Sequence, residues 1–213
     1  MNIRNHIDGK NLANNILKCV NDYKYLGSHV TNSEKDFNIR KGMAWAACNK
    51  LDKIWRSDLD RIVKIKIFRA AIAPILLYGS ETWTLSSKQQ CRLDGCYTRL
   101  LRRVLNISWK KHPTIATLYG DLPRISTQVK RRRIQFAGHC ARATDELVSS
   151  FVLWRHPSSL HRSRKLTFPD TLSRDTSIAK DDLLTAMTDR VYWRSVVNSI
   201  SAEAERWWWW WII

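Results

Sequence analysis

A predicted helix over residues 86–106 places five cations on one face. If each residue advances the helix by about 100°, the five fall within about 100° of one another: Lys88, Arg92, Arg99, Arg102 and Arg103. The stripe is about 22 Å long, at about 1.5 Å per residue. Guanidinium groups bind phosphate oxygens bidentately, so the stripe can meet several phosphates in a row. The alternative is the solvated face of an ordinary amphipathic helix.

The other residues of the same segment indicate why the cationic face should point toward solvent. Ser86 and Gln89 have capping-box spacing, which starts the helix. The half opposite the cations is apolar: Leu93, Cys96, Tyr97, Leu100, Leu101, Val104 and Leu105. Only Asp94 lies among the cations in the sequence, so they are not arranged as i, i+4 ion pairs. This absence of acids favours a phosphate partner over a solvated face.

A second basic group follows in a predicted helix over residues 125–142. Four consecutive cations occupy it: Lys130, Arg131, Arg132 and Arg133. Consecutive residues point around a helix rather than along one face, so some of the four must face a partner or solvent. A nuclear-import signal is a rival use for the same residues.

The charge of the whole chain favours a polyanionic partner. Its 213 residues carry a net charge of +17, and residues 1–156 hold 28 Lys and Arg against 12 Asp and Glu. Nucleic acid is the first partner that such a field suggests, and an anionic membrane the second. No apolar run reaches the roughly 18 residues that a membrane span needs, so we expect no membrane association. The polar start MNIRNHIDGKNLANN predicts no signal peptide, hence a nuclear or cytoplasmic location with reduced cysteines.

The predicted fold class is mainly α with a short β-hairpin at the front. An Asp8-Gly9 turn and the segment YKYLGSHVT indicate extended structure. Helical periodicity then runs from an N-cap at Ser33 as far as residue 57. A segment that is apolar nearly all round follows to Gly79, kinked at Pro74 and expected in the middle of a core. Residues 156–178 are expected to be irregular, and a last helix is predicted over 181–198.

The chain ends in WWWWWII, with tryptophan at residues 207–211. No helix or strand pattern requires five consecutive tryptophans, and an exposed run would promote aggregation. Because tryptophan has a single codon, we interpret the run as translated simple-sequence DNA. A membrane-interface anchor is the alternative.

Several segments, in order, resemble the C-terminal part of the reverse transcriptase of non-LTR (LINE-type) retrotransposons. The strings that carry the resemblance span most of residues 5–198: DGKNL, YKYLGSHV, AWAACNKLDKIW, PILLYGSETWTLS, LDGCYTRLLRRVLNISWKKH, RRIQFAGHCAR and LLTAMTDRVYWRSVV. The family's Arg-Gly-Arg-Pro element is replaced here by HRSRKLTF.

This resemblance implies a role for each part of the chain. Tyr25, Leu26 and Gly27 would form the primer grip, whereas without the resemblance they indicate a simple hairpin end. The implied parts are a residual palm edge and primer-grip hairpin over 1–32, a helical thumb over 33–111, a basic helical segment over 112–155, and an irregular linker, C-terminal helix and Trp-rich tail over 156–213. RNA, DNA or RNA–DNA hybrid would be the ligand, with the palm and fingers of a polymerase as a further partner.

The catalytic carboxylates of such an enzyme, which hold Mg²⁺, lie upstream of the primer grip. Here Asp8 and Asp22 are the only acids before Tyr23, and the pair Asp181-Asp182 is explained by helix capping. We therefore expect no catalytic residue, no cofactor and no polymerase activity in this chain alone. The cysteines lack zinc spacing. Two alternatives stay open: a non-functional remnant of a decayed element, and a trans-acting part of a split polymerase.

Overall fold

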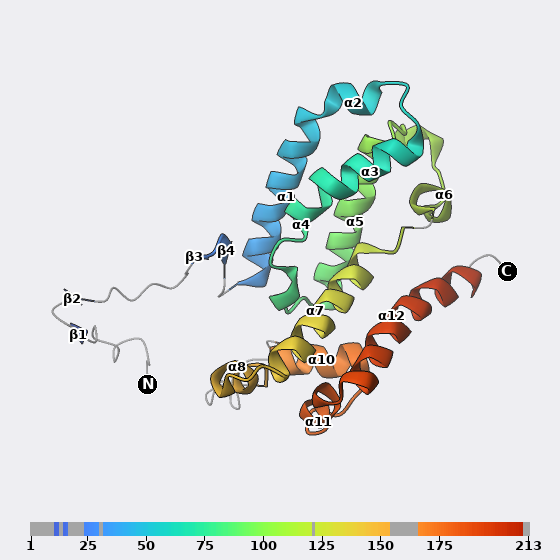
Figure 1. Cartoon of the computed structure of the whole chain (residues 1–213). Helices are drawn as coiled ribbons and strands as arrows, with labels where there is room; N and C mark the ends of the chain where they lie inside the picture. The colour runs from blue at the N-terminus through green and yellow to red at the C-terminus, as the bar shows by residue number, and fades with distance from the viewer. Residues whose placement is uncertain are drawn as a thin grey trace.

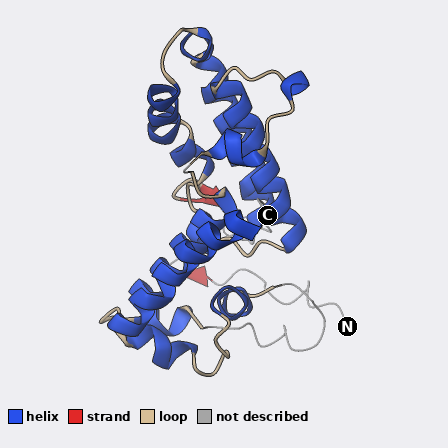
Figure 2. Cartoon of the chain, turned by 90° about the vertical axis from the view of Figure 1, so that its right-hand side faces the viewer, coloured by secondary structure: helices blue, strands red, loops and turns tan. Residues whose placement is uncertain are grey.

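The computed structural model describes residues 11–12, 15–16, 24–29, 32–120, 122–153 and 166–210. Helices make up most of the described chain (Figures 1 and 2), so the predicted mainly α class is confirmed. Within these residues, strand pairing is limited to two short antiparallel ladders: β1 (Asn11–Leu12) with β2 (Asn15–Ile16), and β3 (Lys24–Tyr25) with β4 (Ser28–His29).

The β3–β4 hairpin confirms the predicted turn at the front of the chain. Tyr25 pairs with Ser28, which leaves Leu26 and Gly27 as a two-residue loop. Both have positive φ, 45° and 88°, as in the type I′ turns that match strand twist. Glycine adopts this conformation without strain, whereas leucine rarely does.

The first long helix is shorter than predicted. Helix α1 (Ser33–Lys50) is capped by Asn32, one residue before the predicted cap, whose side chain accepts hydrogen bonds from the Glu34 and Lys35 amides. It ends at Leu51, and α2 (Asp52–Arg56) continues as a separate short helix. The periodicity of Ala44, Cys48 and Trp55 does not reveal this break, because all three are buried on both sides of it.

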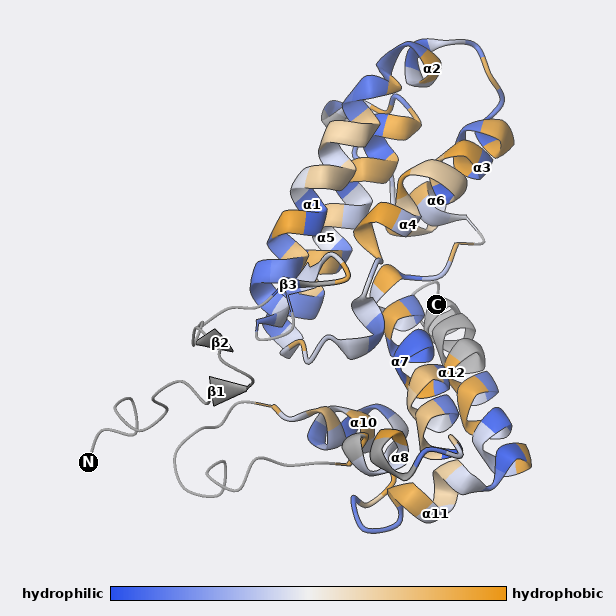
Figure 3. Cartoon of the chain, turned by 60° about the vertical axis from the view of Figure 1, so that its left-hand side comes forward, coloured by the Kyte–Doolittle hydropathy of each residue, from blue (hydrophilic) through white to orange (hydrophobic). Residues whose placement is uncertain are grey.

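The apolar segment that follows is also divided. It forms α3 (Arg61–Ala71) and α4 (Ala73–Leu76), with the break just before Pro74 as predicted, and a 3₁₀ turn, η2 (Ser80–Thr82), begins after Gly79. Its expected place inside the core is wrong for α3, because Ile62 is 67% exposed. Both helices are nonetheless largely hydrophobic (Figure 3).

Helix α5 (Ser87–Val104) is the element that the sequence predicts best. Ser86 accepts a hydrogen bond from the Gln89 amide and the Gln89 side chain accepts one in return, which completes the capping box. Six of the seven predicted apolar residues are buried, and Leu105 is half-buried. The short helices η3 (Trp109–Lys111) and α6 (Ile115–Tyr119) follow.

The remaining helices pack around α7 (Ile125–Ala141), the helix predicted over residues 125–142. They are α8 (Glu146–Phe151), α10 (Phe168–Thr176), α11 (Leu183–Thr188) and α12 (Arg190–Trp210). Helix α10 lies within the segment expected to be irregular, and the single helix predicted over 181–198 is two helices that meet at Asp189. The side chains of the tryptophan run lie outside the described residues.

The described helices form two apolar clusters. The first is built from α1 to α6 and the start of α7, around Trp55, Trp83 and Tyr97. The second is built from the rest of α7 with α10, α11 and α12, around Leu172, Met187 and Trp193. None of the described helices combines the length and the apolar character that a bilayer crossing requires.

Candidate nucleic-acid interface

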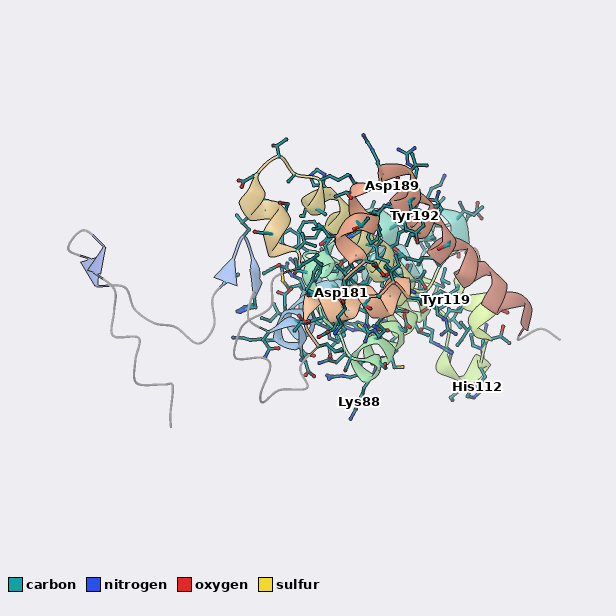
Figure 4. The ribbon with its side chains drawn as sticks, turned by 90° about the horizontal axis from the view of Figure 1, so that it is seen from below. Lys88, His112, Tyr119, Asp181, Asp189 and Tyr192 are labelled. Atoms are coloured by element: carbon teal, nitrogen blue, oxygen red, sulfur yellow. The ribbon has the colours of Figure 1, made fainter. Side chains whose placement is uncertain are left out.

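The cationic face of α5 points away from the first apolar cluster. Burial of the opposite half fixes the rotation of the helix, which leaves Lys88, Arg92 and Arg99 exposed and Arg102 and Arg103 half-buried. Figure 4 shows Lys88 extending outward from the edge of the molecule. The structure therefore brings all five predicted cations to one side of one helix.

Arg92 is paired with an acid from another helix. Its guanidinium forms an ion pair with Glu34 in the first turn of α1, and each side chain is 44% exposed. The Gln89 side chain also donates to Glu34, at 3.0 Å. Hydrogen bonds from Gln89 and Arg92 lower the pKa of the Glu34 carboxyl below its usual value. Arg92 thus ties the start of α5 to α1.

Arg103 is paired in the same way at the other end of α5. It contacts the Asp52 carboxylate, which also accepts Arg56 at 2.8 Å. The prediction that the cations of the stripe form no i, i+4 ion pairs within α5 therefore agrees with these two pairs, but the inferred lack of acidic partners is wrong for Arg92 and Arg103, whose acids come from α1 and α2. Asp94 itself is used elsewhere: it accepts from the Ser126 amide and hydroxyl at 3.0 and 2.8 Å.

Three cations of the stripe belong to no ion pair among the described residues. Lys88 and Arg102 form no ion pair or hydrogen bond within the described part of the chain, and Arg99 donates only to the Gly95 carbonyl of its own helix, at 3.1 Å. A backbone carbonyl leaves most guanidinium donors available. This part of the face is able to bind an anion without first breaking an ion pair.

The four cations of α7 are divided between surface and interior. Arg131 is exposed, Lys130 and Arg132 are half-buried, and Arg133 is only 1% exposed. Arg133 pairs with Asp175 of α10, and burial lowers its pKa against the opposing effect of that carboxylate. Arg133 is therefore corrected from a candidate contact to an interior residue, because a nucleic acid cannot reach its guanidinium.

Arg132 lies beside the hairpin rather than beside α5. Its guanidinium is 3.4 Å from the Leu77 carbonyl and 3.8 Å from the Glu81 carboxylate. Arg132 and Leu26 border the same surface hollow of about 670 Å³, together with Tyr78 and Trp83. Two groups of predicted residues, distant in sequence, are thus neighbours here.

The hairpin loop is fastened to the helical bundle by its backbone. The Tyr78 hydroxyl donates to the Leu26 carbonyl at 2.6 Å, and Arg40 donates to the Gly27 carbonyl at 2.5 Å. The Arg40 guanidinium also lies over the Tyr78 ring, 4.2 Å from its centroid. The Leu26 side chain remains 74% exposed, and that of Tyr25 lies outside the described residues.

A buried carboxylate completes this attachment. Asp36 accepts hydrogen bonds from the His29 amide at 3.1 Å and the Trp83 indole at 2.9 Å, and lies 3.8 Å from Arg40. Sequence reasoning missed Asp36, Arg40 and Tyr78 as hairpin supports. The available sequence signal was an acid and a base at i, i+4 spacing near the start of α1.

Other chemistry finds little support among the described residues. They contain no group of three His, Cys, Asp or Glu side chains placed to hold a metal ion. Burial raises the pKa of the thiols of Cys48, Cys96 and Cys140, which disfavours the reactive thiolate. Asp181 and Asp182 are exposed in the turn before α11. Asp182 occupies the N-cap position, but its side chain accepts no hydrogen bond from a helix amide, so the predicted side-chain capping is wrong.

Comparison with known proteins gives one informative similarity. No protein-family model matches the chain, and no solved structure matches it. Among curated proteins, it is 26% identical over 198 residues to a "putative uncharacterized transposon-derived protein" of Caenorhabditis elegans, which covers 84% of this chain and 70% of that protein. The similarity suggests a transposon origin.

Proposed function

We propose that this chain is the nucleic-acid-binding part of a retrotransposon reverse transcriptase, and that it holds a template–primer duplex by its phosphates. The observation that carries the proposal is the exposed face of α5, where Lys88, Arg99 and Arg102 have no carboxylate partner among the described residues. The net charge of +17 and the transposon-derived relative support it. Binding of this kind is weakly sequence-specific and strongly salt-dependent.

The hairpin has a supporting role in this proposal. Leu26 and Gly27 would approach the primer strand, with Tyr25 beside them, as the resemblance to LINE-type enzymes implies. Two features support that role: the loop carbonyls are held by Arg40 and Tyr78, and Arg132 lies across the adjoining hollow. A fixed loop holds a strand with less loss of conformational entropy than a free one.

The test is fluorescence anisotropy with a labelled RNA–DNA hybrid over a salt series. Arg99→Ala/Arg102→Ala is compared with Arg190→Ala/Arg194→Ala, which removes the same charge from α12, a helix that packs mainly on α7 and α11. The first pair is expected to weaken binding about tenfold or more and to reduce the salt slope by about two. Equal effects of the two pairs, or affinity indifferent to salt, would refute the proposal.

Catalysis lies outside this function. The full enzyme would need two carboxylate-bound Mg²⁺ ions, which the palm of another segment or chain would supply. Primer extension by a palm-and-fingers fragment, with and without this chain, tests whether it acts as part of a split polymerase. Stimulation that is lost with Arg99→Ala/Arg102→Ala would support that role.

A second candidate is a remnant of a decayed transposable element without a present function. The tryptophan run at residues 207–211 and the similarity to a transposon-derived protein favour it. Detection of its peptides in nuclear or cytoplasmic extracts would count against this reading, and failure to bind the hybrid would favour it.

A further inference from the structure

Asp52 holds two guanidinium groups with one carboxylate at the end of α5. Its Oδ2 lies 2.8 Å from Arg56, one turn further along α2, and its Oδ1 contacts Arg103. The site therefore carries a net positive charge although it contains an ion pair. The Arg56 side chain is 64% exposed and that of Arg103 is 39% exposed, so both keep donors open to solvent.

This site continues the cationic face. Arg103 is four residues after Arg99, hence about one turn further on the same side of α5. Helix α2 packs on α5, and the ion pair between Asp52 and Arg103 joins the two helices, so Arg56 approaches this end of the face from a different helix. Arg56 did not emerge from the sequence, because no pattern within α2 indicates its proximity to Arg103.

We infer that Arg56 and Arg103, positioned by Asp52, form a phosphate-binding site for the nucleic-acid backbone. Two guanidiniums held in fixed relative positions lose less side-chain entropy on binding a phosphate than two free ones. The Asp52 carboxylate is a positioning group that does not itself touch the ligand. The inference rests on the proposed function and extends it by one site and one new residue, Arg56.

The direction in which one substitution changes the affinity distinguishes a positioning role of Asp52 from a simple effect of its charge. Asp52→Asn raises the net charge by one, so long-range attraction alone predicts tighter binding of a polyanion. Loss of positioning predicts the reverse: about three- to tenfold weaker binding, with the salt slope reduced by about one phosphate contact. Asp58→Asn is the matched control, since Asp58 is exposed and forms no ion pair within the described residues.

The experiment measures anisotropy of a labelled RNA–DNA hybrid with the full chain at several salt concentrations. Support requires weaker binding and a smaller salt slope for Asp52→Asn, with unchanged or tighter binding for Asp58→Asn. If both variants bind equally or more tightly than the wild type, the inference is overturned. If Asp52→Asn only lowers the folded fraction, binding weakens while the salt slope stays the same, and this result identifies the effect as structural.

Arg56→Ala keeps the inference testable if Asp52→Asn fails to fold. It is expected to weaken binding about threefold or more and to lower the salt slope by about one. Arg194→Ala on α12 is expected to have a smaller effect on both the affinity and the salt slope. Equal effects of Arg56→Ala and Arg194→Ala would overturn the inference while leaving the proposed function standing. Absence of salt-dependent binding by the wild type would instead remove the proposed function.

Discussion

Arg133 on α7 and Asp175 on α10 form an ion pair in the interior, although 42 positions separate them in the sequence. Their side chains are 1% and 6% exposed, and Arg174 approaches the second carboxylate oxygen at 3.5 Å. A buried ion needs its partner, because the protein interior solvates an isolated charge poorly. The pair therefore fixes α10 against α7.

Replacement of either partner alone is expected to destabilise the fold strongly. Arg133→Ala leaves the Asp175 carboxylate buried with less compensation, so we expect a loss of about 3 kcal/mol or more in the free energy of unfolding. Arg131→Ala, two residues earlier on the same helix but exposed, is expected to change the free energy of unfolding by less than about 0.5 kcal/mol. Urea denaturation of both variants measures the difference, and equal losses would contradict the structural assignment of Arg133.

Gly79 occupies a position that no other residue fits well. Its φ is 71°, and a Cβ added there would overlap the Ser28 hydroxyl of the hairpin. Gly79→Ala is expected to destabilise the protein by about 1–3 kcal/mol. Gly42→Ala lies within α1, and apart from the local helix backbone and its chain neighbours no atom lies within 4 Å of the added Cβ, so it is expected to stabilise the protein by about 0.4–1 kcal/mol. Urea denaturation should therefore give shifts of opposite sign.

The hydroxyl of Tyr78 is expected to restrain the hairpin. Tyr78→Phe removes its hydrogen bond to the Leu26 carbonyl and retains the ring beneath Arg40. A net hydrogen bond contributes about 0.5–1.5 kcal/mol, so the amides of residues 24–29 should exchange with solvent roughly two- to tenfold faster. Hydrogen-exchange mass spectrometry measures this. Tyr192→Phe is the control, and equal exchange in both variants would show that the hydroxyl does not restrain the loop.

Asp170 gives the fold a defined response to acid. Burial tends to raise its pKa, but hydrogen bonds from Lys180 and Thr167 and the Lys180 charge outweigh it, lowering the pKa to about 2 from 3.8. A lowered pKa stabilises the fold above about pH 4, and this contribution, up to about 2 kcal/mol, is lost as pH falls towards 2.

The measurement compares wild type with Asp170→Asn by urea denaturation between pH 5 and pH 2. The stability advantage of the wild type should shrink over that range and nearly vanish at its acid end. Asp181→Asn removes an exposed acid and should show no such convergence. A wild-type advantage that is constant across the range would show that the carboxylate is not responsible.

Local signals predicted α5 well and interactions between helices poorly. The capping box at Ser86 and the apolar face of α5 depend on residues within one segment, which the sequence displays directly. The ion pairs of Arg92 and Arg103 depend on Glu34 and Asp52, which lie on other helices. No periodicity within α5 contains that information.

The same distinction applies to α7. Helical geometry requires four consecutive cations to point in different directions, so at least one inward side chain was foreseeable. That it is Arg133 depends on Asp175, in a segment expected to be irregular. The sequence does not reveal the break between α1 and α2 at Leu51, because the spacing of the apolar residues stays helical across it.

Helix α7 supplies Ile125 and Val129 to the first apolar cluster and Ile134 and Ala137 to the second. One continuous helix is thus part of both clusters, so a large rotation of one cluster relative to the other would require this helix to bend. Cleavage within α7 would expose apolar residues of both clusters, so the resulting fragments should aggregate. Calorimetry of the intact chain should show a single unfolding transition.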